Sequence, residues 1–286
     1  MAPFVAAIRP HAKEWTPAIL LFPALLVLGI FVAVPLLGII RVSVANDIAG
    51  DGFTLDNYTA IVTDPFYIGV FIDTALTGLG VTVVALLIGY PIALYVGLGA
   101  GIIRRYVVFA VLSPLLISVV VRAYALAILI GPNNPIEQLL GSDHDFSLLF
   151  TRAGVIVGLV YTLMPFMVLS IIASVSSIDP RLLAAARSLG ASSWAVLWRI
   201  ILPLSAPGLM AGSLVVFTLA ITSFALPLLL GGTRYKMAVS FIWEQLLVLF
   251  NWPFGYAISL VLLLLAALTL YAATRFSART KGAFLQ

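Results

Sequence analysis

Long uncharged stretches recur along the chain, and each is long enough to cross a lipid bilayer as a helix. The first runs from Trp15 to Ile40 without a charged residue, whereas a bilayer crossing needs about 20 residues. Backbone amides in lipid must find partners within their own segment, so each crossing has to be helical. The six expected crossings lie at about 16–40, 72–103, 106–130, 153–178, 207–230 and 254–274.

Composition places the chain in the membrane class. Of its 286 residues, 63% are hydrophobic and only 9% are charged, while soluble domains carry roughly 25% charged residues. The sequence therefore predicts an all-α membrane protein. The first apolar stretch is too long for a signal peptide, whose apolar core spans roughly 7–15 residues, and we interpret it as a retained helix. With no cysteine and two histidines, we expect no metal site.

Lysine and arginine residues set the expected orientation, because they are enriched in cytoplasmic loops. If both termini are inside, ten of the fifteen lie on the cytoplasmic side. They are Arg9, Lys13, Arg104, Arg105, Arg181, Arg187, Arg199, Arg275, Arg279 and Lys281. The outer loop at 41–71 is acidic instead, with Asp47, Asp51, Asp56 and Asp64. These acids either solvate an exposed loop, dock a soluble partner or attract cations.

The loop between the fourth and fifth crossings, at about 179–203, begins with the pattern of a short helix. Asp179 is a typical N-cap residue, and Pro180 suits the first helical position. Good helix formers follow over 182–189. Gly190 is placed to end this helix.

A second short helix is expected in the same loop. Ser192 or Ser193 can cap it, and it would run over 194–201 until Pro203 ends it. From the residues alone, the first of the two helices either presents its small alanines to a partner protein or rests on the lipid headgroups.

The same loop resembles the EAA motif of ABC importer permeases. That motif reads Glu-Ala-Ala, three residues, Gly, nine residues, Ile, one residue and Leu-Pro. The matching positions are Ala185, Ala186, Gly190, Ile200, Leu202 and Pro203. The chain departs from the family at Ala184, where a glutamate often helps to hold the ATPase subunit. One polar contact with the ATPase subunit is therefore in question.

Further stretches are similar to permeases of the spermidine/putrescine type. They lie at 56–58, 89–93, 119–124, 188–192 and 251–254. This resemblance implies a type I ABC importer permease fold, N-in and C-in, with a cytoplasmic coupling helix, in the bacterial inner membrane. It also implies transport of a polyamine such as spermidine or putrescine, with opines, aminophosphonates and other small organic solutes left open.

The resemblance also implies partners. We expect a second permease subunit, most often a different one, two ATPase subunits that bind ATP and Mg, a periplasmic binding protein and membrane lipid, but no nucleic acid. The chain has no Gly-x-x-x-x-Gly-Lys-Ser/Thr phosphate loop, so we expect a non-catalytic subunit without a cofactor of its own. The residues expected to couple it to the ATPase are Leu182, Leu183, Ala184, Ala185, Ala186, Leu189, Gly190, Ile200, Leu202 and Pro203.

These expectations divide the chain into five parts. They are a cytoplasmic segment (1–15), a first transmembrane helix (16–40), a periplasmic loop (41–71), a permease core (72–275) and a cytoplasmic tail (276–286).

Arg122 is the most suggestive residue for a substrate pathway, because it lies well inside the expected third crossing. A central arginine costs at least about 2.5–3.5 kcal/mol on insertion scales. It should therefore face a watery cavity, snorkel to the outer headgroups, or pair with Asp73 or Glu244. An unpaired Arg122 would suit a carboxylate or phosphonate better than a polyamine.

Other residues could line a pathway for an amine. Acids and aromatic rings recognise ammonium groups, and the candidates of this kind are Asp73, Glu244, Trp243 and Tyr124. Thr218 and Thr222 share one face of the expected fifth crossing, close to Phe224, and could form a gate. Alternatively, these residues serve the membrane interface or helix packing.

A stand-alone secondary transporter, a channel or a membrane enzyme is the alternative class. We find no convincing inverted repeat, no dense cluster of intramembrane acids for ion coupling and no inward-facing catalytic group.

Overall fold

The computed structural model describes residues 16–99, 101–132 and 147–283. Helices account for most of these residues, and no β-strand occurs among them. The predicted all-α fold is therefore confirmed. The expected cytoplasmic segment 1–15 and the last residues of the tail, 284–286, lie outside the described part.

Five helices of the described chain are long and apolar enough to cross a membrane, and a bent pair can supply a sixth crossing. Four of them are α1 (Thr16–Ser43), α3 (Pro65–Leu98), α7 (Arg152–Val175) and α12 (Trp252–Ala283). The other is the continuous run Ser193–Ile221, which ends with α10 (Leu202–Ile221). The bent pair consists of α4 (Ile102–Leu116) and α5 (Val119–Ile130). Shorter elements connect the crossings: α2 (Asp56–Thr63), α8 (Pro180–Ser188), α9 (Ser193–Val196), α11 (Ala238–Trp243) and the π-helical turns η1 (Leu197–Ile201), η2 (Pro227–Gly231) and η3 (Glu244–Val248).

Helices α3, α7 and α10 pack against one another and form the centre of the fold. Fully buried side chains fill the space between them, including Val81, Leu159, Met167 and Val216. The helices approach closely at small residues, because a Cβ atom at Gly208 of α10 would lie 2.6 Å from the backbone oxygen of Ser170 in α7. Such small residues allow helix backbones to pack tightly in a membrane.

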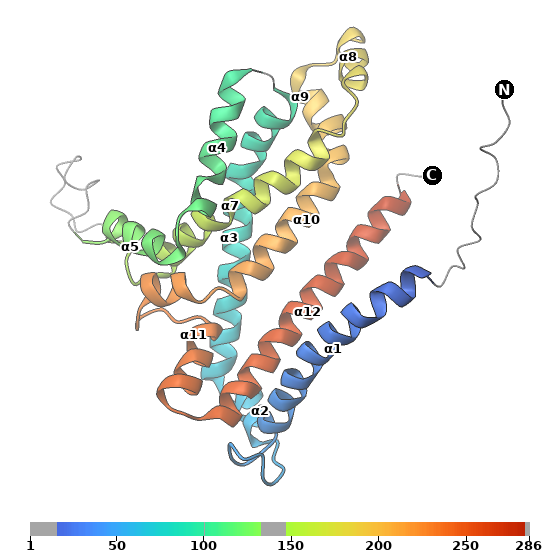
Figure 1. The fold of residues 1–286 in the computed structure, drawn as a ribbon. Helices are drawn as coiled ribbons and strands as arrows, with labels where there is room; N and C mark the ends of the chain where they lie inside the picture. Colours follow the sequence, from blue (N-terminus) through green and yellow to red (C-terminus); the bar gives the residue numbers. More distant parts are fainter. Residues whose placement is uncertain (1–15, 100, 133–146, 284–286) are drawn as a thin grey trace, which may run out of the picture.

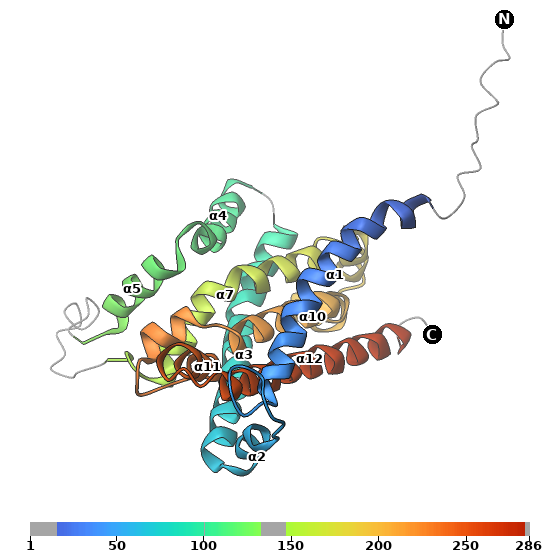
Figure 2. The ribbon, with the colours of Figure 1, turned by 60° about the horizontal axis from the view of Figure 1, so that its bottom comes forward.

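The remaining crossings flank this core. Both views place α1 and α12 on one side and α4 with α5 on the other (Figure 1, Figure 2). No residue in the apolar window of α1 is buried, so this helix faces lipid or another subunit. Helix α8 lies at the end of the bundle toward which α12 runs and from which α1 starts, and α2 lies at the opposite end (Figure 1). This arrangement agrees with the N-in, C-in orientation.

The second crossing starts earlier than expected. α3 begins at Pro65 rather than near 72, and α2 occupies another part of the expected loop at 41–71. The Asp64 carboxylate accepts a hydrogen bond from the Phe66 amide at 2.9 Å, and Pro65 takes the first helical position. Capping residues set this start, so the helix extends beyond the apolar stretch.

The third crossing, expected over 106–130, is formed by two helices with a sharp bend between them. α4 ends at Leu116, and α5 turns away from it by 107°. Pro114 has no amide hydrogen for the carbonyl of Ala110, and the Ser113 hydroxyl donates to that carbonyl at 2.8 Å. Proline and its polar neighbour thus weaken the helix just before the bend.

The fifth crossing also differs at both ends. Pro203 does not end a short helix, because η1 continues directly into α10. In this π-helical turn the Leu202 amide bonds to the Leu197 carbonyl, and the wider register accommodates a following residue without an amide hydrogen. At its other end α10 stops at Ile221 instead of reaching 230, and a break at 222–224 separates it from η2.

Candidate functional site

Helix α8 is a short helix on the cytoplasmic side, called the knob below, and hydrogen bonds cap both of its ends. The Asp179 carboxylate accepts a hydrogen bond from the Arg181 amide at 2.8 Å. At the other end Gly190 has a φ of +82°, and its amide donates to the Arg187 carbonyl at 2.9 Å. The Ala191 amide donates to the carbonyl five residues back at 3.1 Å. These two bonds form a Schellman cap, which needs a left-handed residue.

One face of the knob is anchored and the other is open. Leu183 and Ala186 pack against a small buried cluster of Ile178, Val196 and Ile201. Leu189 is 89% exposed and Leu182 is 52% exposed, and Ala184 and Ala185 are exposed beside them. The anchored face fixes the knob to the bundle, and the open face offers apolar surface to a partner.

The second half of the loop supports the knob. Ser192 accepts a hydrogen bond from the Ala195 amide at 3.2 Å and so caps α9. Ile200 packs against the same buried cluster as α8, while Leu202 and Pro203 form the first turn of α10. The knob is thereby connected to α10, a membrane-crossing helix.

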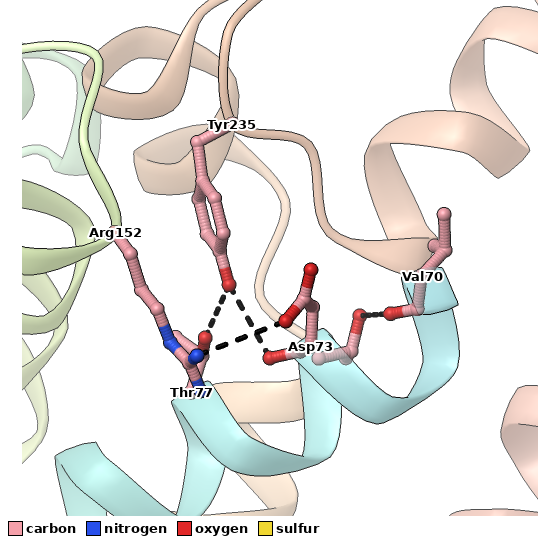
Figure 3. A network of polar contacts seen from close by, with 6 residues as sticks. Val70, Asp73, Thr77, Arg152 and Tyr235 are labelled. Carbon is pink, nitrogen blue, oxygen red and sulfur yellow. Dashed lines mark hydrogen bonds and ion pairs between the residues drawn. The ribbon is translucent and has the colours of Figure 1, made fainter. Parts of the chain in front are cut away.

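A polar network joins three segments at the outer part of the fold (Figure 3). Asp73 of α3 lies 3.7 Å from the Arg152 guanidinium at the start of α7. The Tyr235 hydroxyl, from the segment before α11, contacts the Thr77 hydroxyl and donates to the Asp73 carbonyl at 3.3 Å. Burial and, to a lesser extent, the charge of Asp73 raise the pKa of Tyr235, while the hydrogen bond with Thr77 and the charge of Arg152 partly oppose this. The phenol therefore stays protonated and can donate.

Arg122 lies in the first turns of α5, just after the bend, and is only 5% exposed. Its Nε and Nη1 atoms have no hydrogen-bond partner. The two acids considered as partners pair elsewhere, Asp73 with Arg152 and Glu244 with Lys236. Arg122, expected well inside the third crossing, thus lies in the second helix of the bent pair. Tyr124, two residues further on, is exposed.

Trp243 and Glu244 line a cavity of about 370 Å³ next to the break in the fifth crossing. The Trp243 ring lies 6.0 Å from the Phe224 ring, which belongs to that break. Glu244 accepts a hydrogen bond from the Lys236 ammonium at 2.7 Å. Sequence reasoning missed Lys236, because only the turn before α11 brings it to Glu244.

The remaining gate candidates lie at the end of α10. Thr222 is the C-cap residue of α10, and its hydroxyl donates to the carbonyl of Thr218, one turn earlier, at 2.8 Å. The structure thus brings Thr218, Thr222, Phe224, Trp243 and Glu244 to one region. Among the described residues, no hydrogen bond, ion pair or ring contact joins them to Asp73 or Arg122. Within the described residues no group of three or more His, Cys, Asp or Glu side chains could hold a metal ion.

The described chain thus contains five or six apolar crossings, one of them the bent pair α4 and α5, and an exposed knob on the cytoplasmic side. The family described as the binding-protein-dependent transport system inner membrane component matches residues 82–282. The chain belongs to this family, and it is a permease subunit of an ABC importer located in the inner membrane.

Individual relatives agree with the family. The spermidine/putrescine transport system permease protein PotB of Escherichia coli is 35% identical over 229 residues, covering 79% of this chain and 83% of that protein. The molybdenum transport system permease protein ModB of Mycobacterium bovis is 28% identical over 241 residues, covering 84% of this chain and 87% of that protein. A chain of a bacterial ABC transporter involved in the import of the acidic polysaccharide alginate shares the fold, with a TM-score of 0.76, 20% identity and coverage of 93% and 96%. That alginate transporter also forms a complex with a periplasmic protein bound to an alginate pentasaccharide.

Proposed function

We propose that this subunit and a second, different permease subunit form the pathway of an importer for a small amine-bearing solute, with a polyamine such as spermidine or putrescine as the first candidate. A periplasmic binding protein delivers the solute, and two ATPase subunits bind ATP and Mg below the membrane. The identity to PotB supports the substrate class, and the periplasmic protein on the alginate transporter supports the delivery step.

The open face of α8 is the observation that carries the coupling part of the proposal. Leu182 and Leu189 expose apolar surface to water, which is unfavourable unless a partner covers it. A groove on each ATPase subunit would bury this face. Closure of the ATPase dimer on ATP binding would then pull α8 of both permeases together and, through η1 and α10, open the pathway outward. Hydrolysis would reset it.

The break in the fifth crossing supports an amine pathway. An acid and two aromatic rings meet there, namely Glu244, Trp243 and Phe224. A carboxylate together with aromatic faces recognises an ammonium group. Unwound helix segments within transporters commonly line binding sites. We assign this region to the path of the amine group.

A solute that also carries an acid is the second candidate, for example an opine or an aminophosphonate. Arg122 favours it, because two of its buried nitrogens have no partner and a guanidinium pairs well with carboxylate or phosphonate oxygens. Of the similar proteins named above, ModB belongs to a molybdenum transport system, and another belongs to a transporter involved in the import of an acidic polysaccharide. A pathway with both Glu244 and Arg122 could accept an amine at one end of a solute and an acid at the other.

Uptake by the complete importer in proteoliposomes tests the proposal. Radiolabelled putrescine should accumulate only with ATP and the binding protein, and excess unlabelled spermidine should compete. Competition by an aminophosphonate but not by spermidine would favour the second candidate. ATP-independent flux through the purified chain alone would contradict an importer subunit and indicate a self-contained transporter.

A further inference from the structure

At the cavity beside Trp243, the Lys236 ammonium pairs with Glu244 in the way that a bound amine would. The Lys236 ammonium lies 2.7 Å from a Glu244 carboxylate oxygen and 5.3 Å from the centroid of the Phe241 ring. A carboxylate and an aromatic face are the two groups that recognise a primary ammonium ion. The protein thus holds one of its own ammonium groups in a site with the chemistry of an amine receptor.

The cavity is also lined by a buried hydroxyl group that has no hydrogen-bond partner. Ser240 lines it, is 3% exposed, and its hydroxyl oxygen has no hydrogen-bond partner. A buried hydroxyl without a partner costs about 1–3 kcal/mol, so a second polar group of a ligand would be stabilised there. The volume of about 370 Å³ falls within the range of roughly 300–1,000 Å³ that is typical of small-molecule sites.

Lys236 can leave this site without a rearrangement of the backbone. It lies in the segment between η2 and α11, and its flexible side chain is only half-buried. Glu244 is held in the π-helical turn η3, which is anchored at the end of α11. One carboxylate cannot pair fully with two ammonium ions, so a solute amine and Lys236 compete for it.

We propose that this cavity is an ammonium-binding site in which Lys236 is an internal competitor. When the cavity holds no solute, the Lys236 ammonium occupies Glu244. A primary amine of the solute displaces it, with Glu244 as the acceptor and Ser240 as a second contact. This proposal rests on the proposed import of an amine-bearing solute.

The displacement has a route to the transport pathway. Trp243 lines the cavity beside Glu244, and its ring lies 6.0 Å from that of Phe224, in the segment that follows α10. A solute that fills the cavity contacts the Trp243 ring, while a free Lys236 side chain leaves room for it. Occupation of the site is therefore transmitted to the two aromatic residues at the break.

Equilibrium binding of radiolabelled putrescine tests the competition. The complete importer in nanodiscs, without the binding protein, is compared with three variants. Lys236→Met keeps the length of the side chain but removes the competing charge, and we expect about tenfold tighter binding. Glu244→Gln should abolish binding. Arg234→Met is the matched control, because it removes the same charge from the same segment at an exposed position outside this cavity, and it should bind as the wild type does.

The outcomes separate the two proposals. Binding that is unchanged or weaker in Lys236→Met, in an importer that assembles normally, overturns the competitor role. Tighter binding in Arg234→Met as well would point to general electrostatics and also overturns it. Failure of the wild-type importer to take up putrescine with ATP and the binding protein contradicts the polyamine substrate, whereas the response to Lys236→Met still reports on the ammonium site.

Discussion

Gly190 ends α8 in a backbone conformation that other residues adopt only with strain, so substitutions there test the coupling role of this helix. Its φ is +82°. Its amide bonds to the Arg187 carbonyl at 2.9 Å, and the next amide, of Ala191, bonds to the Ala186 carbonyl at 3.1 Å. Both bonds depend on the left-handed conformation at this one position.

The expected free-energy cost differs between three substitutions of Gly190, to alanine, asparagine and proline. A Cβ atom at Gly190 would meet nothing within 4 Å, so alanine adds backbone strain alone, about 1–2 kcal/mol. Asparagine tolerates the left-handed region and should add less. Proline fixes φ near about −65° and removes the amide, so both closing bonds are lost at about 0.5–1.5 kcal/mol each, in addition to the strain.

Uptake and solute-stimulated ATP hydrolysis of the reconstituted importer measure the effect. We expect activity to fall in the order Asn, Ala, Pro, with Gly190→Pro losing uptake while membrane insertion stays normal. Gly101→Ala is a control for backbone strain elsewhere in the chain, because Gly101 has open space around it and precedes α4. Its φ of 111° and ψ of 179° disfavour a side chain at least as strongly as the conformation of Gly190. Wild-type uptake in Gly190→Pro, or equal damage in Gly101→Ala, would refute the reasoning.

Three further substitutions, one of them with a control, probe α8 and other parts of the molecule. Ala186→Asp places a carboxylate against the buried cluster under α8 and should abolish uptake but not insertion, as measured by transport and membrane fractionation. Gly208→Val places a Cβ 2.6 Å from a carbonyl of α7 and should prevent a stable fold, seen as aggregation in size-exclusion chromatography. Gly29→Val, in open space, should not. Arg122→Met should stabilise the substrate-free importer by about 1–3 kcal/mol and weaken uptake of acid-bearing solutes. A lower melting temperature of this variant would show that Arg122 is paired.

The two ends of α8 could be predicted from the sequence, because the residues that cap a helix lie close to its ends in the chain. Asp179 and Pro180 predict where α8 begins, and Gly190 predicts where it ends, since caps depend on residues within one turn. The knob therefore appears where the sequence placed a helix. The role of its exposed face in coupling stays a prediction that the experiments above test.

The polar pairs could not be predicted in the same way. Asp73 meets Arg152, and Glu244 meets Lys236, although sequence reasoning considered both acids as partners for Arg122. Which charges meet depends on how segments far apart in the chain fold beside one another. The turn before α11 brings Lys236 to Glu244, and the close packing of α3 and α7 brings Arg152 to Asp73.

The sequence by itself determined that the chain crosses the membrane about six times with both ends inside, because length, hydrophobicity and basic residues act locally in lipid. The tertiary structure decided where the third crossing bends and where α10 ends. A helix in a membrane can be interrupted only where neighbouring helices and side chains satisfy the freed backbone groups. That condition depends on packing, and so Arg122, Lys236 and Glu244 acquire their surroundings only in the folded protein.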